Sequence, residues 1–321
     1  MHDRRRRIVL GMVVAALLAM PLSGAGFYLD LITKVLILSI FAMSLDLLVG
    51  HTGLISFGHA AFYGIGSYAL MLASPRYDPA SLWWTLPLAT AAAGAAACLV
   101  GLLVVRTRGI YFIMATLAFS QMFFFLAHDT ELGGGSDGVS INFKPLATVA
   151  GHTLIDLASP YHFYYLVLGC AALVFLFLRT LLRSPVGHAL EGIRQNEHRM
   201  RSLGFRVLRY KLASFTLGGM LAGLAGYLSA AQFGFVNPEL FAWHQSGNVL
   251  LMVILGGVGS QYGAVVGAFA FVLLQELFQW ATPHWQLLFG GTIVLLVIFL
   301  PDGLSGAPGR LARAFLGGAD E

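Results

Sequence analysis

Residues 82–105 read LWWTLPLATAAAGAAACLVGLLVV, a run without one charged side chain. A helix needs about 20 predominantly apolar residues to cross the hydrocarbon core of a bilayer, so this run predicts a membrane-spanning helix. The rest of the chain repeats the pattern. Hydropathy predicts a bundle of about ten such helices, some short or broken, at 8–24, 30–49, 53–73, 82–105, 110–128, 161–182, 210–231, 246–258, 262–281 and 285–301.

The composition points the same way. Of the 321 residues, 58% are hydrophobic and 11% are charged. Soluble proteins carry roughly 25% charged residues, and this chain has too few of them to cover a surface that faces water. Its outside must therefore face lipid, which excludes a soluble enzyme, a nucleic-acid-binding domain and a disordered chain. We expect an all-α integral membrane protein.

The basic residues predict the orientation, because Lys and Arg concentrate in cytoplasmic loops. If an even number of spans leaves both ends of the chain inside, only Lys34, Arg76 and Lys144 lie at or beyond the outer boundary. We therefore expect both termini in the cytoplasm. An alternative for the start of the chain is a cleavable signal peptide, because Arg4–Arg7 precede an apolar stretch and the small residues 23–26.

The stretch 50-GHTGLISFGHAAFYGIG-66 departs from a plain apolar helix. Glycine weakens a helix interior, and Ser and His side chains need polar partners in a bilayer. One interpretation is a helix broken beside a translocation path, where bare backbone meets a polar solute. The other is close helix–helix packing through small residues. Packing is the favoured interpretation for two further stripes of small residues, from Ser214 to Ala230 and from Gly259 to Gly267.

A charged segment between two predicted spans, 184–206, has the pattern of an amphipathic helix. Ser184 and Pro185 are typical of a helix start and Gly204 of a helix end, with apolar residues at helical spacing between them. Such a helix either rests on anionic lipid headgroups or docks in a groove of a cytosolic partner. The long loop 129–160, on the other side, is either a flexible linker or a surface for an extracytoplasmic partner.

Several motifs, which occur in order between about residue 40 and residue 306, are similar to those of one transporter family. They are LDLLVGHTG at 45–53, SFGHAAF at 56–62, RGIY at 108–111, GGSDG at 134–138 and LGGVGS at 255–260. Together they resemble the LivM-type permeases of branched-chain amino acid ABC importers.

The resemblance implies a single transmembrane permease domain, 1–321, in the bacterial inner (cytoplasmic) membrane. It implies a LivH-like sister permease, two cytosolic ATPase subunits and a periplasmic substrate-binding protein as partners. The loop 129–160 would be periplasmic, and 184–206 would be the cytoplasmic helix that couples to the ATPases. The residues that match the family's coupling segment are Gly187, Ala189, Leu190, Ile193, Arg194, Asn196, Glu197 and Gly204.

The coupling segment departs from the family pattern at Gly192 and Met200, where alanine is more usual. The bulkier Met200 is expected to alter how deeply the helix seats. Arg194 and Glu197 lie three residues apart, which predicts a charged pair on one helix face. That pair would fix the register in an ATPase groove, while Ile193 and Met200 would supply the contact area.

The chain lacks the motifs of an enzyme. No nucleotide-binding loop of the form G-x-x-x-x-G-K-[ST] occurs, because none of the three lysines follows a glycine. No zinc-binding or nucleophile motif occurs on a predicted span. We therefore expect no enzymatic activity, cofactor or metal in this chain, with ATP and Mg²⁺ bound by the partner ATPase subunits.

Polar residues within the predicted spans are candidates for the translocation path, because such groups are costly in a bilayer and each needs a reason. The candidates are Asp46, Ser56, His59, Gln121 and Asn248. The alternative for Asp46 is an ion pair with Arg106 or Arg108, or a helix cap. The alternative for Gln121 and Asn248 is a helix–helix hydrogen bond.

The resemblance also implies alternative substrates, because relatives of this permease class carry urea, amides or aromatic acids in place of branched-chain amino acids. A self-sufficient secondary transporter is a further alternative, but it typically shows charged relays in several spans, and Asp46 and Glu276 are too few and too far apart. We expect Glu276 at a polar interface with the sister permease.

Overall fold

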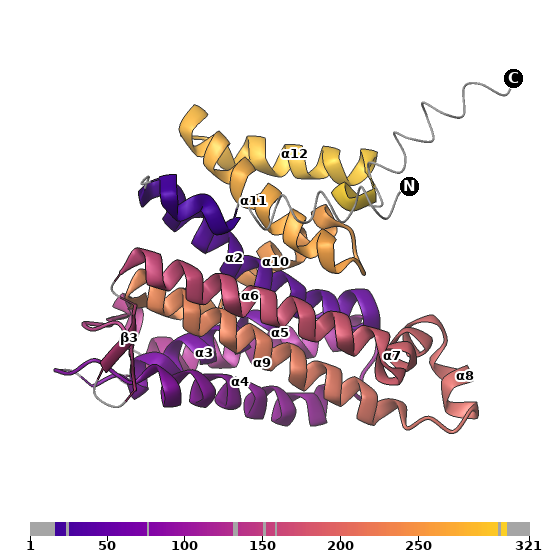
Figure 1. Ribbon diagram of the computed structural model, residues 1–321. Helices are drawn as coiled ribbons and strands as arrows, with labels where there is room; N and C mark the ends of the chain where they lie inside the picture. Colours follow the sequence, from indigo (N-terminus) through magenta and orange to yellow (C-terminus); the bar gives the residue numbers. More distant parts are fainter. Residues whose placement is uncertain are drawn as a thin grey trace, which may run out of the picture.

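The structure, a computed structural model, is an almost entirely helical bundle (Figure 1). It describes residues 17–23, 26–75, 77–130, 134–149, 152–157, 159–300 and 303–306. Most of the predicted first span, 8–24, lies outside these ranges, as do Arg4–Arg7, Arg76, Arg310 and Arg313. The signal-peptide alternative rests largely on the same residues and so lies outside them too.

The helices and strands follow one another along the chain with short connections. The α-helices are α2 (Gly26–Asp46), α3 (His59–Ala73), α4 (Leu82–Val104), α5 (Ile110–Asp129), α6 (Pro160–Arg183), α7 (Pro185–Gln195), α8 (Glu197–Ser202), α9 (Val207–Phe233), α10 (Trp243–Gly256), α11 (Gln261–Ala281) and α12 (Trp285–Phe299). A π-helical turn, η2 (Leu47–Thr52), continues α2, and short 3₁₀ turns are η1 (Met20–Ser23), η4 (Gly135–Asp137) and η5 (Pro238–Phe241). The strands are β1 (Val139–Ser140), β2 (Leu146–Val149), β3 (His152–Asp156) and β4 (Phe235–Val236).

Each predicted segment from 30–49 onward corresponds to one of these helices. Within the described residues, six helical segments are long and apolar enough to cross a membrane: Gly26–Thr52, Leu82–Val104, Ile110–Asp129, Pro160–Arg183, Val207–Phe233 and Gln261–Ala281. The helices α3, α10 and α12 have 15, 14 and 15 residues, fewer than the about 20 of a straight span. The all-α membrane class is confirmed, while the number of spans and the inside location of both termini stay predictions.

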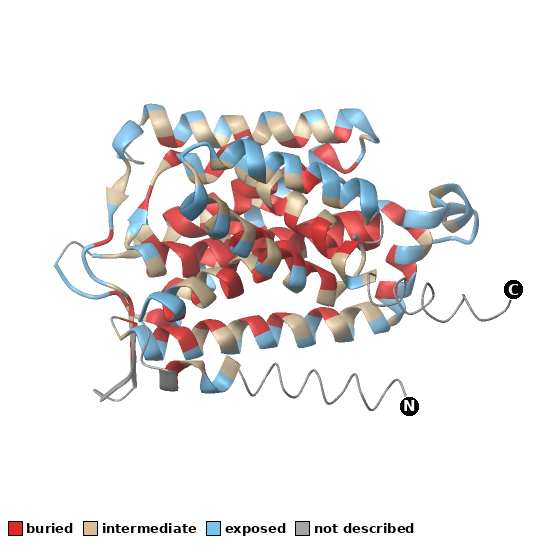
Figure 2. Ribbon diagram, turned by 90° about the horizontal axis from the view of Figure 1, so that it is seen from above, coloured by how far each residue is buried: buried red, intermediate tan, exposed pale blue. Residues whose placement is uncertain are grey.

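The outer surface of the bundle is apolar. Leu99, Tyr111 and Leu173 are 67%, 73% and 68% exposed. Figure 2 shows that the exposed residues gather on the outer helices and the buried ones on the helices in the middle. A soluble protein rarely exposes so much contiguous apolar surface, so this surface faces lipid, as the composition predicted.

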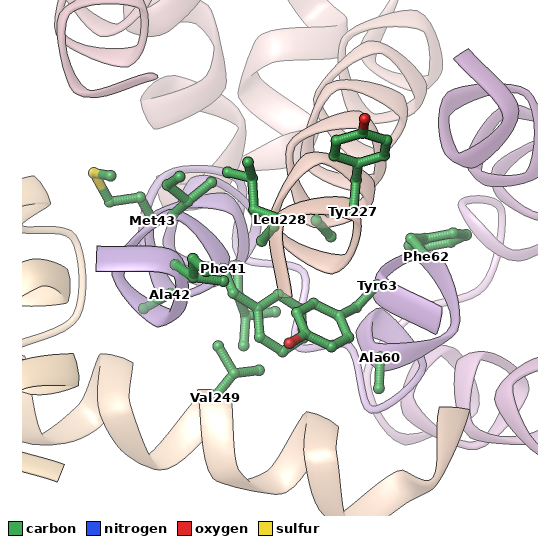
Figure 3. Close-up of a cluster of buried hydrophobic side chains, with 14 of the residues drawn as sticks. Phe41, Ala42, Met43, Ala60, Phe62, Tyr63, Tyr227, Leu228 and Val249 are labelled. Carbon is green, nitrogen blue, oxygen red and sulfur yellow. The ribbon is translucent and has the colours of Figure 1, made fainter. Parts of the chain in front are cut away.

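Helix α2 runs through the centre of the bundle, with α6, α9, α10 and α11 packed around it (Figure 1). Figure 3 shows α2, α3, α9 and α10 converging on one hydrophobic cluster, which includes Phe41, Phe62, Leu228 and Val249. The helix that leads into the glycine-rich stretch is therefore fixed by the core.

Small residues bring helix backbones into direct contact. A Cβ at Gly66 would collide with the carbonyl of Gly223, and one at Gly226 would collide with the carbonyl of Tyr63. A Cβ at Gly267 would collide with the backbone of α10. In lipid the hydrophobic effect does not bring helices together, so they associate through close van der Waals packing at small residues. The structure agrees with the predicted packing role of these small-residue stripes.

The described part of the loop 129–160 is folded onto one end of the bundle. β1 pairs antiparallel with β4, and β2 pairs antiparallel with β3. The amide of Ile141 donates to the carbonyl of Gly234 at 2.8 Å, and that of Leu146 donates to the carbonyl of Ala80 at 2.9 Å. This part is therefore more than a flexible linker. In Figure 1 β3 lies at one end of the bundle, and α7 and α8 lie at the other.

Candidate functional site

The glycine-rich stretch between α2 and α3 is a break in the helix. The turn η2 ends at Gly53, whose φ is 76°, and α3 begins only at His59. The predicted helix 53–73 therefore begins late, because Gly53 adopts a left-handed conformation that ends the turn. A Cβ at Gly58 would collide with the carbonyl of Thr116 on α5. The helix is therefore broken and its glycines also pack closely, while the place of this break beside a translocation path stays a prediction.

Polar groups from three helices meet at this break. Ser56 and His59, both predicted path residues, are fully buried there. The Nε2 atom of His59 lies 2.8 Å from the hydroxyl of Ser44 on α2, while Nδ1 has no hydrogen-bond partner among the described residues. The amide of Ala60 donates to the hydroxyl of Ser246 on α10 at 2.9 Å. The break thus holds a cluster of buried polar groups inside an apolar bundle.

Sequence reasoning missed three hydroxyl groups at the break, those of Ser44, Thr116 and Ser246. The hydroxyl of Thr116 accepts a hydrogen bond from the amide of Phe57 at 3.3 Å. Each of these residues is a small polar side chain in an apolar helix, a pattern that also occurs where a hydroxyl only bonds its own helix. The sequence therefore carried no signal that they meet.

The other two neutral candidates are not joined to the break by a hydrogen bond. Gln121 lies on α5, and its buried Nε2 has no partner among the described residues. Asn248 lies on α10, and its side chain makes no hydrogen bond within the described part of the chain. Neither Nε2 of Gln121 nor the side chain of Asn248 therefore makes the helix–helix hydrogen bond considered above with another described residue. Their place in the translocation path stays a prediction.

Asp46 is the buried acid at the end of α2, with 2% of its surface exposed. Its Oδ1 accepts a hydrogen bond from the amide of Gly259 at 2.7 Å, and its Oδ2 lies 3.7 Å from Nε2 of His51. A Cβ at Gly50 would collide with Oδ1 of Asp46 and lie 2.6 Å from Gly259. The helical stretch 46–51 and the connection at Gly259 can therefore meet here only because Gly50 has no side chain.

Two side chains of α7 reach back to the same turn. The guanidinium group of Arg194 donates to the carbonyl oxygen of Gly50 and lies beside Gly259. The carboxylate of Glu191 lies 3.6 Å from Nδ1 of His51. Helix α7 is therefore attached directly to η2, the turn that precedes the break.

The predicted single helix over 184–206 is two helices. Helix α7 ends at Gln195, and the side chain of Asn196 caps α8 by accepting a hydrogen bond from the amide of Arg199 at 3.0 Å. Asparagine favours this position because it satisfies a free amide of the first turn. The chain bends at Asn196, so the predicted pair of Arg194 and Glu197 is wrong.

Glu197 instead joins three bases. It lies 2.9 Å from Arg108, 2.6 Å from Arg201 and 3.0 Å from Lys211. Burial alone would raise the pKa of the Glu197 carboxyl, but the hydrogen bond from Lys211 and the charges of the three bases hold it below its ordinary value. Because Arg108 contacts Glu197 and Arg106 contacts no acid among the described residues, the ion pair considered for Asp46 is wrong.

Four small or apolar residues of α7 in the coupling segment face inward. Ala189, Leu190 and Ile193 are 4%, 1% and 3% exposed, and Gly187 is also buried. The prediction that Ile193 supplies contact area to a partner is therefore wrong, because this side chain already packs within the chain. Gly204, with a φ of 88°, follows the end of α8 as predicted.

The two departures from the family pattern complement each other. A Cβ at Gly192 would lie 2.8 Å from Sδ of Met200, closer than such atoms approach. Met200 on α8 thus fills the space that Gly192 on α7 leaves open. This contact explains why glycine at position 192 and methionine at position 200 occur together.

A family model described as the permease component of the branched-chain amino acid transport system matches residues 27–298. This chain belongs to that permease family. The permease is 34% identical to the high-affinity branched-chain amino acid transport system permease protein LivM of Escherichia coli K12 over 319 residues, 94% of this chain and 75% of the relative. LivM of Salmonella typhimurium LT2 matches with the same identity and coverage.

The permease is also similar to LivH of Escherichia coli K12, with 24% identity over 290 residues, 84% of this chain and 91% of the relative. No solved structure matches it. The resemblance to LivM-type permeases is confirmed, and the family is one of transport subunits rather than enzymes. With its apolar helices, the chain is a multi-pass membrane permease.

Proposed function

We propose that this permease is the transmembrane subunit of an ATP-driven importer for branched-chain amino acids in the bacterial inner membrane. Its termini lie in the cytoplasm, and a LivH-like sister permease completes the translocation path. Two cytosolic ATPase subunits bind ATP and Mg²⁺, and a periplasmic protein delivers the substrate. The similarity to both LivM and LivH, two permeases of one named transport system, supports this assignment.

The observation that carries the proposal is the attachment of α7 to η2. An importer of this kind must pass movement from its ATPases to the translocation path. Arg194 and Glu191 contact Gly50 and His51, and η2 leads directly into the break at 53–58. A displacement of α7 therefore moves the turn, and with it the polar groups of the break.

The exposed face of α7 and α8 is the surface that contacts the ATPase in this proposal. His188, His198 and Arg199 are exposed, and their side chains make no hydrogen bond, ion pair or ring contact with another described residue. The buried Leu190 and Ile193 instead pack α7 against the rest of the permease. One face of α7 thus contacts the ATPase while the other stays attached to the membrane-spanning helices.

The translocation path lies on a face that the sister permease covers. Ile55 is 43% exposed, so the break reaches the surface of the permease next to the buried Ser56 and His59. Glu276 on α11 lies 3.9 Å from Lys34 on α2, and both side chains are about a third exposed. We assign this ion pair to the polar interface with the sister subunit.

Reconstitution of the whole importer tests the function. The permease, its sister, the ATPases and the binding protein are placed in proteoliposomes, and the uptake of radiolabelled leucine is measured with and without ATP. We expect ATP-dependent accumulation that isoleucine and valine inhibit and that urea and acetamide do not. Accumulation without ATP would indicate a secondary transporter, and uptake of urea or an amide in place of leucine would overturn the substrate assignment.

A further inference from the structure

A groove opens where α8 leads into α9, partly lined by the end of the coupling segment but not by His188, His198 or Arg199, the exposed residues assigned above to the ATPase contact. Its volume is about 580 Å³, within the range of roughly 300–1,000 Å³ that holds small molecules. Val186 of α7 and the connection 203–206 form one side. Arg209, Tyr210 and Ala213, from the first two turns of α9, form the other.

The groove carries uncompensated positive charge. Arg206 and Arg209 are exposed, and their side chains make no ion pair or hydrogen bond with the residues that the structure describes. Glu197, the acid at the start of the preceding helix, is already shared by three other bases. Two arginines at one groove therefore attract an anion.

The groove lies at the depth of the lipid headgroups. Helix α9 has 27 residues, and at 1.5 Å per residue it is about 40 Å long, whereas the hydrocarbon core is about 30 Å thick. Because an arginine is costly within hydrocarbon, the excess of about 10 Å lets the first turn, with Arg209, lie at the level of the headgroups. Leu208 is 45% exposed and Ala213 is exposed too, so the wall of the groove continues into the lipid-facing surface.

We infer that this groove binds the headgroup of an anionic phospholipid from the adjacent leaflet. The phosphate lies between Arg206 and Arg209, and the first part of an acyl chain lies against Tyr210 and Ala213. Basic pockets between membrane helices on the cytoplasmic side bind anionic headgroups in this way. A free phosphate ion would satisfy the two charges but would leave the apolar wall uncovered. The inference does not depend on the substrate or on the ATPases.

Native mass spectrometry of the full-length permease in detergent tests the site. Phosphatidylglycerol or phosphatidylcholine is added, and the fraction of protein that retains lipid is measured. We expect tighter retention of phosphatidylglycerol, weakened roughly 30-fold in the double variant Arg206→Gln/Arg209→Gln, since each arginine near an anionic surface contributes about fivefold. Arg106→Gln is the matched control, because Arg106 is an exposed arginine without an ion pair among the described residues.

A second variant separates shape from charge. Ala213→Trp fills the groove and keeps both arginines, so it should also weaken retention of phosphatidylglycerol, with circular dichroism confirming an intact fold. Equal retention in the wild type and the double variant would overturn the site, and so would displacement of the lipid by millimolar inorganic phosphate. Loss of ATPase co-purification with unchanged lipid retention would assign the groove to the ATPase and contradict the inference.

Discussion

Arg194 on α7 donates a hydrogen bond to the carbonyl oxygen of Gly50 on η2, 144 positions away in the sequence. The guanidinium group reaches this carbonyl because the neighbouring residues, Gly53 and Gly259, have no side chains. A Cβ at Gly53 would lie 3.3 Å from Cγ of Arg194. The contact ties an exposed segment at one end of the bundle to the broken helix in its core.

Gly226→Ala should destabilise the permease, because the added methyl group collides with the carbonyl of Tyr63 where α9 meets α3. Overpacking of this kind costs about 1–3 kcal/mol. The thermal unfolding midpoint of the detergent-solubilised protein measures the effect. Gly169→Ala on α6 is the control, since nothing lies within 4 Å of its added methyl group. Equal midpoints for the two variants would contradict the packing role.

Alanine in place of glycine normally stabilises a helix interior by about 0.5–1 kcal/mol, but in Gly192→Ala the new methyl group meets Sδ of Met200, so this flexible side chain must shift. Gly192→Ala should therefore be nearly neutral in the wild type and should stabilise the Met200→Ala variant. A double-mutant cycle measured by thermal unfolding gives the coupling between the two sites. Additive effects would show that the two residues do not share this space.

Glu197→Gln should destabilise the packing of α8, because Lys211, which is only 6% exposed, loses its charged partner. The cost is on the order of 1–3 kcal/mol. The pKa of Glu197 is lowered in the folded protein, so its contribution is present above the ordinary value of 4.5 and is lost as the pH falls through the folded-state value. The unfolding midpoint of the wild type should therefore fall more between pH 7 and pH 3 than that of Glu197→Gln. Parallel pH profiles would contradict this role.

The features that could be predicted from the sequence are the helices and contacts that depend on a long, regular pattern of residues. The apolar run at 82–105 forms α4 because it is long enough to span a bilayer, and the small residues of α9 pack as their spacing indicated. The bend at Asn196 was not predictable, because an asparagine among charged residues fits a continuous amphipathic helix as well as a cap. The partner of Asp46 was not predictable either, because the amide of Gly259 belongs to the backbone and leaves no chemical signal in the sequence.

The central claim is that movement of α7 reaches the broken helix through the contact of Arg194 with Gly50. The number of leucine molecules taken up per ATP in the Arg194→Ala variant tests it most directly. Leucine uptake and ATP hydrolysis are measured together in proteoliposomes that contain the complete importer. Loss of the hydrogen bond to Gly50 should leave assembly and ATP hydrolysis intact and lower the leucine taken up per ATP on the order of 10-fold, the effect of losing one hydrogen bond from a charged group. Arg194→Lys should restore part of the ratio, and Arg106→Ala should keep the wild-type ratio. An Arg194→Ala importer that takes up as much leucine per ATP as the wild type would contradict the account.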